Sequence, residues 1–208
     1  ESGDTPGTRK TFIYNTFEKL MKAISKSLKK NDPNHLNLGI RYGYIEQLDD
    51  ELLRISKESF DALSFNCYAL SPDHEKMNHA LEISGLPMII GEYHFGTVDR
   101  GLAQSLWQVN SQKERGDAFR YYTENAFAHR GLIGTGWFRW IDQNINGRTD
   151  GENYNCGFID VTDRPYPYMV DAAIETAKSL YEIHSGTKTP FHQAPNAVGH
   201  SPIPDLWE

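Results

Sequence analysis

Residues 86–96, LPMIIGEYHFG, join an apolar strand to a group of reactive side chains. The run from Pro87 to Gly91 is short and apolar and lies between turn-forming residues, which is typical of a buried strand. Glu92 and His94 follow directly, where this strand ends. In barrel enzymes the functional residues lie at the carboxyl ends of parallel strands. The segment therefore predicts a buried strand that presents Glu92 at the functional edge of a barrel.

The rest of the chain alternates between predicted helices and strands. Apolar residues recur at three- and four-residue steps from Tyr14 to Leu28, which predicts a helix that ends near residues 31–33. Further helices are expected at about residues 49–57, 71–85, 110–128 and 165–184, and strands at about 36–42, 61–68, 87–91 and 132–138. Such alternation indicates right-handed βαβ units on a parallel sheet.

Two α/β architectures fit this alternation, a doubly wound sheet and a (β/α)8 TIM barrel. No glycine-rich phosphate loop follows any predicted strand, which removes the usual reason for a nucleotide-binding sheet. The four strand ends are polar or aromatic: Arg41-Tyr42, Asn66 to Tyr68, Glu92 to His94 and Trp137 to Arg139. A complete barrel has eight strands in about 250 residues. We therefore expect residues 1–184 to form roughly half of a barrel, and residues 185–208 to form an irregular tail that packs Phe191 or Trp207 into surface grooves.

Composition limits the partners of this chain. Its 208 residues carry 28 acidic and 21 basic side chains, a net charge of −7, without a basic run that could track nucleic acid. No apolar run approaches the roughly 20 residues that span a bilayer. We expect neither nucleic acid nor a membrane as partner. Cys67 and Cys156 lack the spacing of metal ligands. Two distant cysteines do not indicate whether the protein works in a reducing or an oxidising compartment. The chain shows no signal peptide and begins at Glu1.

Glu92 is the candidate catalytic residue. A carboxylate at a barrel strand's end serves as nucleophile or as general acid/base, and the plainer alternative is a structural ion pair with an arginine. Arg41 is expected to pair with Glu92 and to favour its ionised form. His94 shares a strand face with Glu92 if alternation continues, so Glu-x-His is a possible metal pair. The neighbouring strand ends offer no further metal ligands, so we expect no metal, and His94 to bind substrate hydroxyls or to orient Glu92.

Aromatic residues surround the end of the fourth strand. Strict alternation sends Trp137 and Arg139 to one side, and Phe138 and Trp140 to the other. At least one of these rings is expected in the core. An indole offers a flat apolar face for a sugar ring and an N–H for a hydroxyl. We expect Trp137 to be this platform.

Residues 141–155 follow the fourth strand as a polar segment, rich in amides and bent by two glycines. The plain interpretation is a solvated loop. Beside a site, the same amides and carboxylates suit a neutral polyhydroxylated ligand better than a phosphate. The candidate binding residues in this segment are Asp142, Glu152, Asn153 and Tyr154.

Together these residues resemble the clan A retaining glycoside hydrolases, and most closely the family-50 β-agarases. The matching stretches are Asp32 to Leu36, Gly39 to Tyr42, Ile90 to Gly96, Asp99 to Gly101, Trp137-Phe138, Asp142-Gln143, Gly147 to Tyr154 and Gly157 to Asp160. The resemblance implies a (β/α)8 barrel of which this chain supplies strands five to eight. It also implies a β-linked galactan as substrate, no cofactor, and a secreted or periplasmic enzyme.

The same resemblance implies roles for individual residues. Glu92 corresponds to the nucleophile, and Trp137 to the eighth-strand aromatic that floors the sugar subsite. Arg41, Asn66, Tyr68 and His94 would position the nucleophile, and Arg139 at the end of the fourth strand is a further candidate for binding the substrate.

The family's acid/base glutamate lies at the end of the fourth strand, which this chain lacks. Retaining hydrolysis needs two carboxyl groups about 5 to 5.5 Å apart. We therefore expect the chain to be inactive alone, and to associate with a complementary N-terminal half or with its own copy. The alternative function is a non-catalytic carbohydrate-binding module on a partial barrel. The sequence leaves open the linkage and whether cleavage is exo or endo.

Overall fold

The computed structural model describes residues 3–199. Its helices are α1 (Pro6–Asn31), the short 3-10 helix η1 (Ile45–Gln47), α2 (Asp50–Ser59), α3 (His74–Ser84), α4 (Gln112–Phe127) and α5 (Pro167–His184). Its strands are β1 (Arg41–Tyr42), β2 (Leu63–Asn66), β3 (Met88–Tyr93), β4 (Trp107–Gln108), β5 (Leu132–Trp137) and β6 (Val198–Gly199). The predicted alternation of helices and strands is confirmed.

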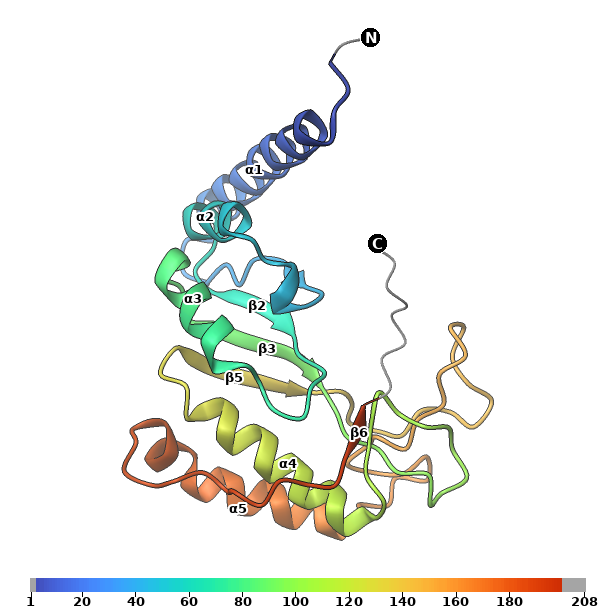
Figure 1. Cartoon of the computed structure of the whole chain (residues 1–208). Helices are drawn as coiled ribbons and strands as arrows, with labels where there is room; N and C mark the ends of the chain where they lie inside the picture. Colours follow the sequence, from blue (N-terminus) through green and yellow to red (C-terminus); the bar gives the residue numbers. More distant parts are fainter. Residues whose placement is uncertain (1–2, 200–208) are drawn as a thin grey trace.

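Four strands form one parallel sheet in the order β1-β2-β3-β5, which is also their order in the chain (Figure 1). In a doubly wound sheet the strand order reverses at one point, and the ligand binds there. This sheet has no such reversal. The fold is therefore α/β, with every functional strand end on the same edge.

One face of the sheet is buried and the other is open. Leu63, Phe65, Met88 and Ile90 are 0% exposed and share the core with side chains of α2, α3 and α4. Side chains that alternate with them, such as Ser64, Asn66 and Ile89, are only half-buried. Helices thus cover one face, while the opposite face carries the polar strand ends.

The first strand is shorter than expected. Residues 36–40 lie outside β1, because Gly39 adopts a left-handed backbone with φ of 72° that interrupts an extended chain. The last helix begins at Pro167 rather than at Pro165, and Pro167 stands at the first helical positions, where a missing N–H costs nothing.

The segment after α5 runs back along the molecule. Phe191 donates its backbone N–H to Glu124 Oε2 at 2.8 Å, and the Arg120 guanidinium lies 4.6 Å from its ring centre. Farther on, β6 pairs antiparallel with β4. Trp207 lies outside the described residues. Cys67 and Cys156 are both buried and free, and none of the described helices has the length and apolar character to cross a membrane.

Candidate active site

Glu92 receives three donors at the carboxyl edge of the sheet. Arg41 Nη2 lies 2.8 Å from Glu92 Oε1, so the expected ion pair is present. Asn66 Nδ2 donates to Glu92 Oε2 at 3.0 Å, and the Tyr68 hydroxyl donates to the same oxygen at 2.8 Å. The three donors come from the ends of β1 and β2, and the Glu92 side chain keeps 19% of its surface exposed. The sheet therefore holds an accessible carboxylate in a fixed orientation.

A β-bulge turns Glu92 toward these donors. Phe65 pairs with Ile90, but Asn66 pairs with Glu92, so Gly91 is an extra residue in β3. Without it, alternation would place Glu92 on the buried side with Ile90. A Cβ atom at position 91 would also collide with Cδ of Arg41. Gly91 thus supplies both the bulge and the space through which Arg41 reaches Glu92.

Tyr68 acts as a neutral donor. Burial raises the pKa of Tyr68 well above its usual value, and its hydrogen bond to Glu92 raises this pKa further. The hydroxyl therefore keeps its proton and points it at the carboxylate.

His94 lies behind Tyr68 and does not face the open site. It is 1% exposed, its Nε2 accepts the backbone N–H of Leu106 at 3.2 Å, and its Nδ1 lies 3.1 Å from the Phe138 carbonyl oxygen. Burial lowers the pKa of His94 to about 3, so the ring is neutral and Nδ1 carries the proton. The expectation that His94 binds substrate hydroxyls is wrong, since the main chain occupies both nitrogens. Its ring supports Tyr68, edge-on at 5.0 Å.

Trp137 is half-buried and packs against the edge of the core. Trp137 pairs with Tyr93 on the helix side of the sheet and packs edge-on against Phe119 of α4 at 5.6 Å. Its indole N–H donates to the Cys156 carbonyl at 2.7 Å. The indole N–H therefore already has a partner within the chain, and the expectation that the ring of Trp137 floors the sugar stays a prediction.

Phe138, the next residue, lies near His94. Its ring is half-buried and lies 6.0 Å from the His94 ring, on which Tyr68 also packs. The sequence placed Trp137 and Phe138 on opposite faces of the strand, but it could not decide which of the two faces borders Glu92. Arg139 is half-buried, and its expected role in binding the substrate stays a prediction. Trp140 is 68% exposed and stacks on Phe158.

The polar segment after β5 is bonded mainly to itself. Asp142 is 5% exposed and accepts hydrogen bonds from the Gly157 N–H, Asn155 Nδ2 and the Tyr166 hydroxyl. These internal donors use most of the acceptor capacity of the carboxylate, and its predicted role in holding the sugar stays a prediction.

Three other predicted residues of this segment also have internal contacts. Glu152 accepts from Gln143 Nε2 at 2.8 Å and pairs with Arg148. Asn153 Oδ1 accepts the Ala103 N–H. Tyr154 is half-buried and reaches the Glu92 group through His94, its ring 5.7 Å from the imidazole.

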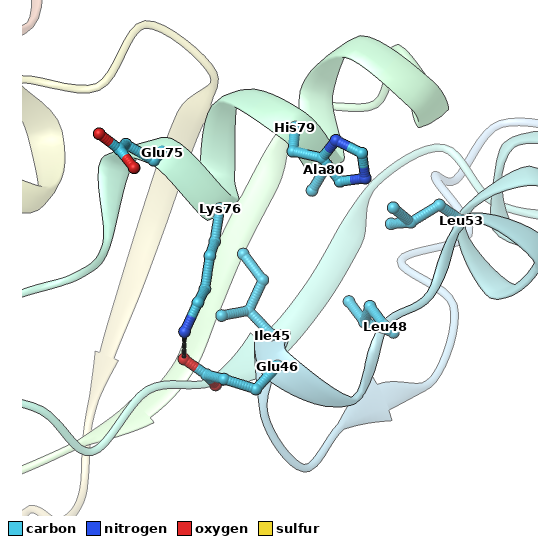
Figure 2. A pocket seen from close by; sticks show the side chains of 8 residues that line it. All are labelled: Ile45, Glu46, Leu48, Leu53, Glu75, Lys76, His79 and Ala80. Atoms are coloured by element: carbon cyan, nitrogen blue, oxygen red, sulfur yellow. Dashed lines mark hydrogen bonds and ion pairs between the residues drawn. The ribbon is translucent and has the colours of Figure 1, made fainter.

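The described residues hold no group of three or more His, Cys, Asp or Glu side chains that could bind a metal ion. A cavity of about 500 Å³ lies between η1, α2 and α3, with an apolar floor that includes Ile45 and Leu53 (Figure 2). An ion pair of Glu46 with Lys76, 3.0 Å long, crosses its rim. No side chain of the Glu92 group lines this cavity, which is therefore separate from the candidate active site.

Known proteins with similar sequences are agarases. No protein-family model matches the chain. β-Agarase A of Vibrio sp. (strain JT0107) is 36% identical over 165 residues, and β-agarase B of the same strain is 34% identical over 170 residues. These matches cover 76% and 78% of this chain, but only 16% and 17% of the two agarases. The chain thus spans about a sixth of the length of these relatives.

Solved structures of agarases also resemble the fold of this chain. An exo-β-agarase superposes with a TM-score of 0.79 at 32% identity, covering 88% of this chain and 25% of the other. PfGH50B superposes with a TM-score of 0.77 at 35% identity, covering 82% and 25%. In sequence and in fold, the chain resembles the family-50 β-agarases over most of its length.

Proposed function

We propose that this chain is the Glu92-bearing half of a (β/α)8 barrel in a retaining glycoside hydrolase that cleaves an agarose-like, β-linked galactan. The observation that carries the proposal is the Glu92 carboxylate, held by Arg41, Asn66 and Tyr68 at the carboxyl edge of a parallel sheet. The similarity to β-agarases supplies the class of substrate.

In this mechanism Glu92 attacks the anomeric carbon while an acid protonates the departing glycosidic oxygen. The C–O bond to the leaving sugar breaks, and an ester forms between Glu92 and the galactosyl unit. Water, deprotonated by the same acid/base group, then releases the sugar and restores the carboxylate. Arg41, Asn66 and Tyr68 orient the nucleophile and stabilise its charge in the free enzyme.

We assign the acid/base carboxyl to a complementary half of the barrel. Arg41 and Tyr42 form the edge strand β1, which pairs only with β2 within the described sheet. Helix α1 exposes an apolar row that other protein must cover: Phe12, Ile13, Leu20, Ile24 and Leu28. The open face of the sheet adds Ile133, which is 52% exposed. An added barrel half would cover both surfaces and bring the second carboxyl to Glu92.

The sugar platform in this proposal is Phe138 rather than Trp137. Phe138 and Tyr68 pack on the same imidazole, His94, and Tyr68 donates to Glu92. A ring in this place can stack on the sugar whose anomeric carbon faces Glu92.

Covalent labelling tests the assignment of Glu92. The complete barrel, with this chain as one half, is incubated with a 2-deoxy-2-fluoro-galactoside that carries an activated leaving group, and the labelled peptide is mapped by mass spectrometry. We expect the label on Glu92, and none in the Glu92→Gln variant. Labelling at another carboxylate would overturn the proposal. Galactan binding without labelling or turnover would favour a carbohydrate-binding module.

A further inference from the structure

The segment after α5 runs along α4 and ends beside the loop that follows β3 (Figure 1). Its fixed point on α4 is Phe191. The buried carboxylate of Glu124 accepts the Phe191 N–H at 2.8 Å, and Asn125 Nδ2 donates to the Phe191 carbonyl at 3.0 Å. Residues 190–199, called the strap below, are therefore held on α4 before they reach β6.

At its far end the strap packs on the loop that follows His94. The strand β4 in this loop has two pairing partners, which are β6 of the strap and Gly96. The Gly96 N–H donates to the Trp107 carbonyl at 2.8 Å, and the Trp107 ring packs edge-on against Phe95 at 6.4 Å. Gly199 lies against the same ring, since a Cβ at position 199 would meet its Cζ2 at 2.9 Å. Trp107 thus connects the strap to the two residues that directly follow His94.

Further contacts connect β4 to the carboxylate of Glu92. Leu106, the residue before β4, donates its backbone N–H to His94 Nε2 at 3.2 Å. The imidazole packs edge-on against the Tyr68 ring at 5.0 Å, and the Tyr68 hydroxyl donates to Glu92 Oε2 at 2.8 Å. His94 is 1% exposed, so its ring cannot turn without displacing a neighbour. A continuous series of contacts therefore joins the strap to Glu92.

We propose that the strap is a positioning element for Glu92, acting through β4, His94 and Tyr68. This inference rests on the proposed function, in which Glu92 is the nucleophile. The strap holds β4, β4 holds the imidazole of His94, and the imidazole keeps the Tyr68 hydroxyl in line with the carboxylate. A hydrogen bond weakens when its donor leaves this line, and a misplaced nucleophile reacts more slowly. Since the strap does not touch the sugar, it should affect the rate of the chemical step and leave sugar binding unchanged.

Two variants loosen the strap at its two ends. Gly199→Val places a side chain against the Trp107 ring and should push β6 away from β4. Phe191→Ala removes the ring that packs on α4 and leaves β6 unaltered. The matched control is Val198→Thr, because Val198 is 55% exposed and threonine keeps its shape and its backbone pairing. Circular dichroism checks that all three variants are folded.

The first measurement is the labelling of Glu92 by the activated fluoro-galactoside in the complete barrel. Both strap variants should lower the labelling rate at saturation by about three- to tenfold, less than the loss of a whole charged hydrogen bond, with the dissociation constant of the reagent unchanged. Val198→Thr should label at the parent rate. An unchanged rate in both strap variants would overturn the proposal.

A double variant separates positioning from a general loss of structure. In a Tyr68→Phe background, Gly199→Val should cause no further slowing, because the hydroxyl through which the strap acts is gone. Slowing by the same factor with and without this hydroxyl would show that the strap acts by another route, and would overturn the proposal.

The second measurement needs no activity. Hydrogen–deuterium exchange of the 208-residue chain reports on the Leu106 amide, which its bond to His94 protects. Gly199→Val should speed this exchange about tenfold or more, and Val198→Thr should leave it unchanged. Unchanged Leu106 exchange in Gly199→Val would refute the coupling even if the barrel is active. An unlabelled parent barrel would instead refute the proposed function, so the two failures are distinguishable.

Discussion

The guanidinium of Arg41 reaches the carboxylate of Glu92, 2.8 Å away, directly over the backbone of Gly91. This passage exists because position 91 has no side chain. Gly91 therefore has two effects: it forms the bulge that directs the Glu92 side chain, and it leaves the space that the Arg41 side chain occupies.

Gly91→Ala should therefore uncouple this pair. The added methyl group displaces Arg41, and we expect covalent labelling of Glu92 in the complete barrel to slow by about tenfold or more, the equivalent of one lost charged hydrogen bond. Gly134→Ala is the control, since a Cβ at position 134 of the neighbouring strand would meet Ile89 at an ordinary 3.6 Å. Equal labelling rates in the two variants would show that the Arg41 contact has no catalytic value.

Tyr68→Phe removes one donor from Glu92 and little else. A hydrogen bond to a charged group contributes about 1.5–3 kcal/mol, so the labelling rate should fall roughly 10- to 100-fold. Circular dichroism should show an unchanged fold. Tyr181→Phe, at a tyrosine that is 89% exposed, is the matched control and should label at the parent rate. A Tyr68→Phe enzyme with full activity would contradict the role of Tyr68.

His94 makes stability depend on pH. The pKa of His94 is about 3 in the folded chain and about 6.5 in the unfolded chain. Between these two pH values His94 is protonated in the unfolded chain but neutral in the folded chain. The free energy of unfolding should fall by about 1.4 kcal/mol per pH unit as the pH drops from about 6.5 toward 4.

Urea unfolding across this range checks the contribution of His94. His94→Gln should show a shallower decline than the parent chain, whereas His35→Gln, at a surface histidine, should retain the parent slope. Identical slopes for the parent and His94→Gln would mean that His94 titrates normally.

Trp137 and Phe138 should respond differently to substitution. Trp137→Phe loses the hydrogen bond to Cys156 and core volume, so we expect about 1–3 kcal/mol less stability. Phe138→Ala should instead raise KM for galactan oligosaccharides severalfold in the complete barrel. Denaturant melts and steady-state kinetics of both variants separate the two roles. An unchanged KM in Phe138→Ala would remove Phe138 from the sugar site.

The isolated chain should self-associate. Its exposed apolar row on α1 and its open sheet face leave surfaces that water solvates poorly. Size-exclusion chromatography with light scattering should therefore show oligomers, and Leu20→Lys with Ile24→Lys should shift them toward monomer. A well-folded monomer of the parent chain would contradict the incomplete barrel.

The sequence by itself determined the five α-helices and the four strands of the parallel sheet in their order, but not η1 or the short pair β4-β6. Helical periodicity, the Asp73 cap and the left-handed Gly85 are local signals, and α3 lies between them as expected. The carboxylate at the end of β3 and its arginine partner were also visible, because parallel strands bring their carboxyl ends to one edge.

Tertiary structure alone decided which way the side chains at this edge point. Alternation has a period of two, so a single extra residue at Gly91 reverses every later assignment in the strand, and a one-residue signal of this kind is invisible without the pairing partner. The same limit applies to His94 and Trp137. Their polar atoms are satisfied by carbonyls and N–H groups of residues 12 to 44 positions away, contacts that only the folded chain supplies.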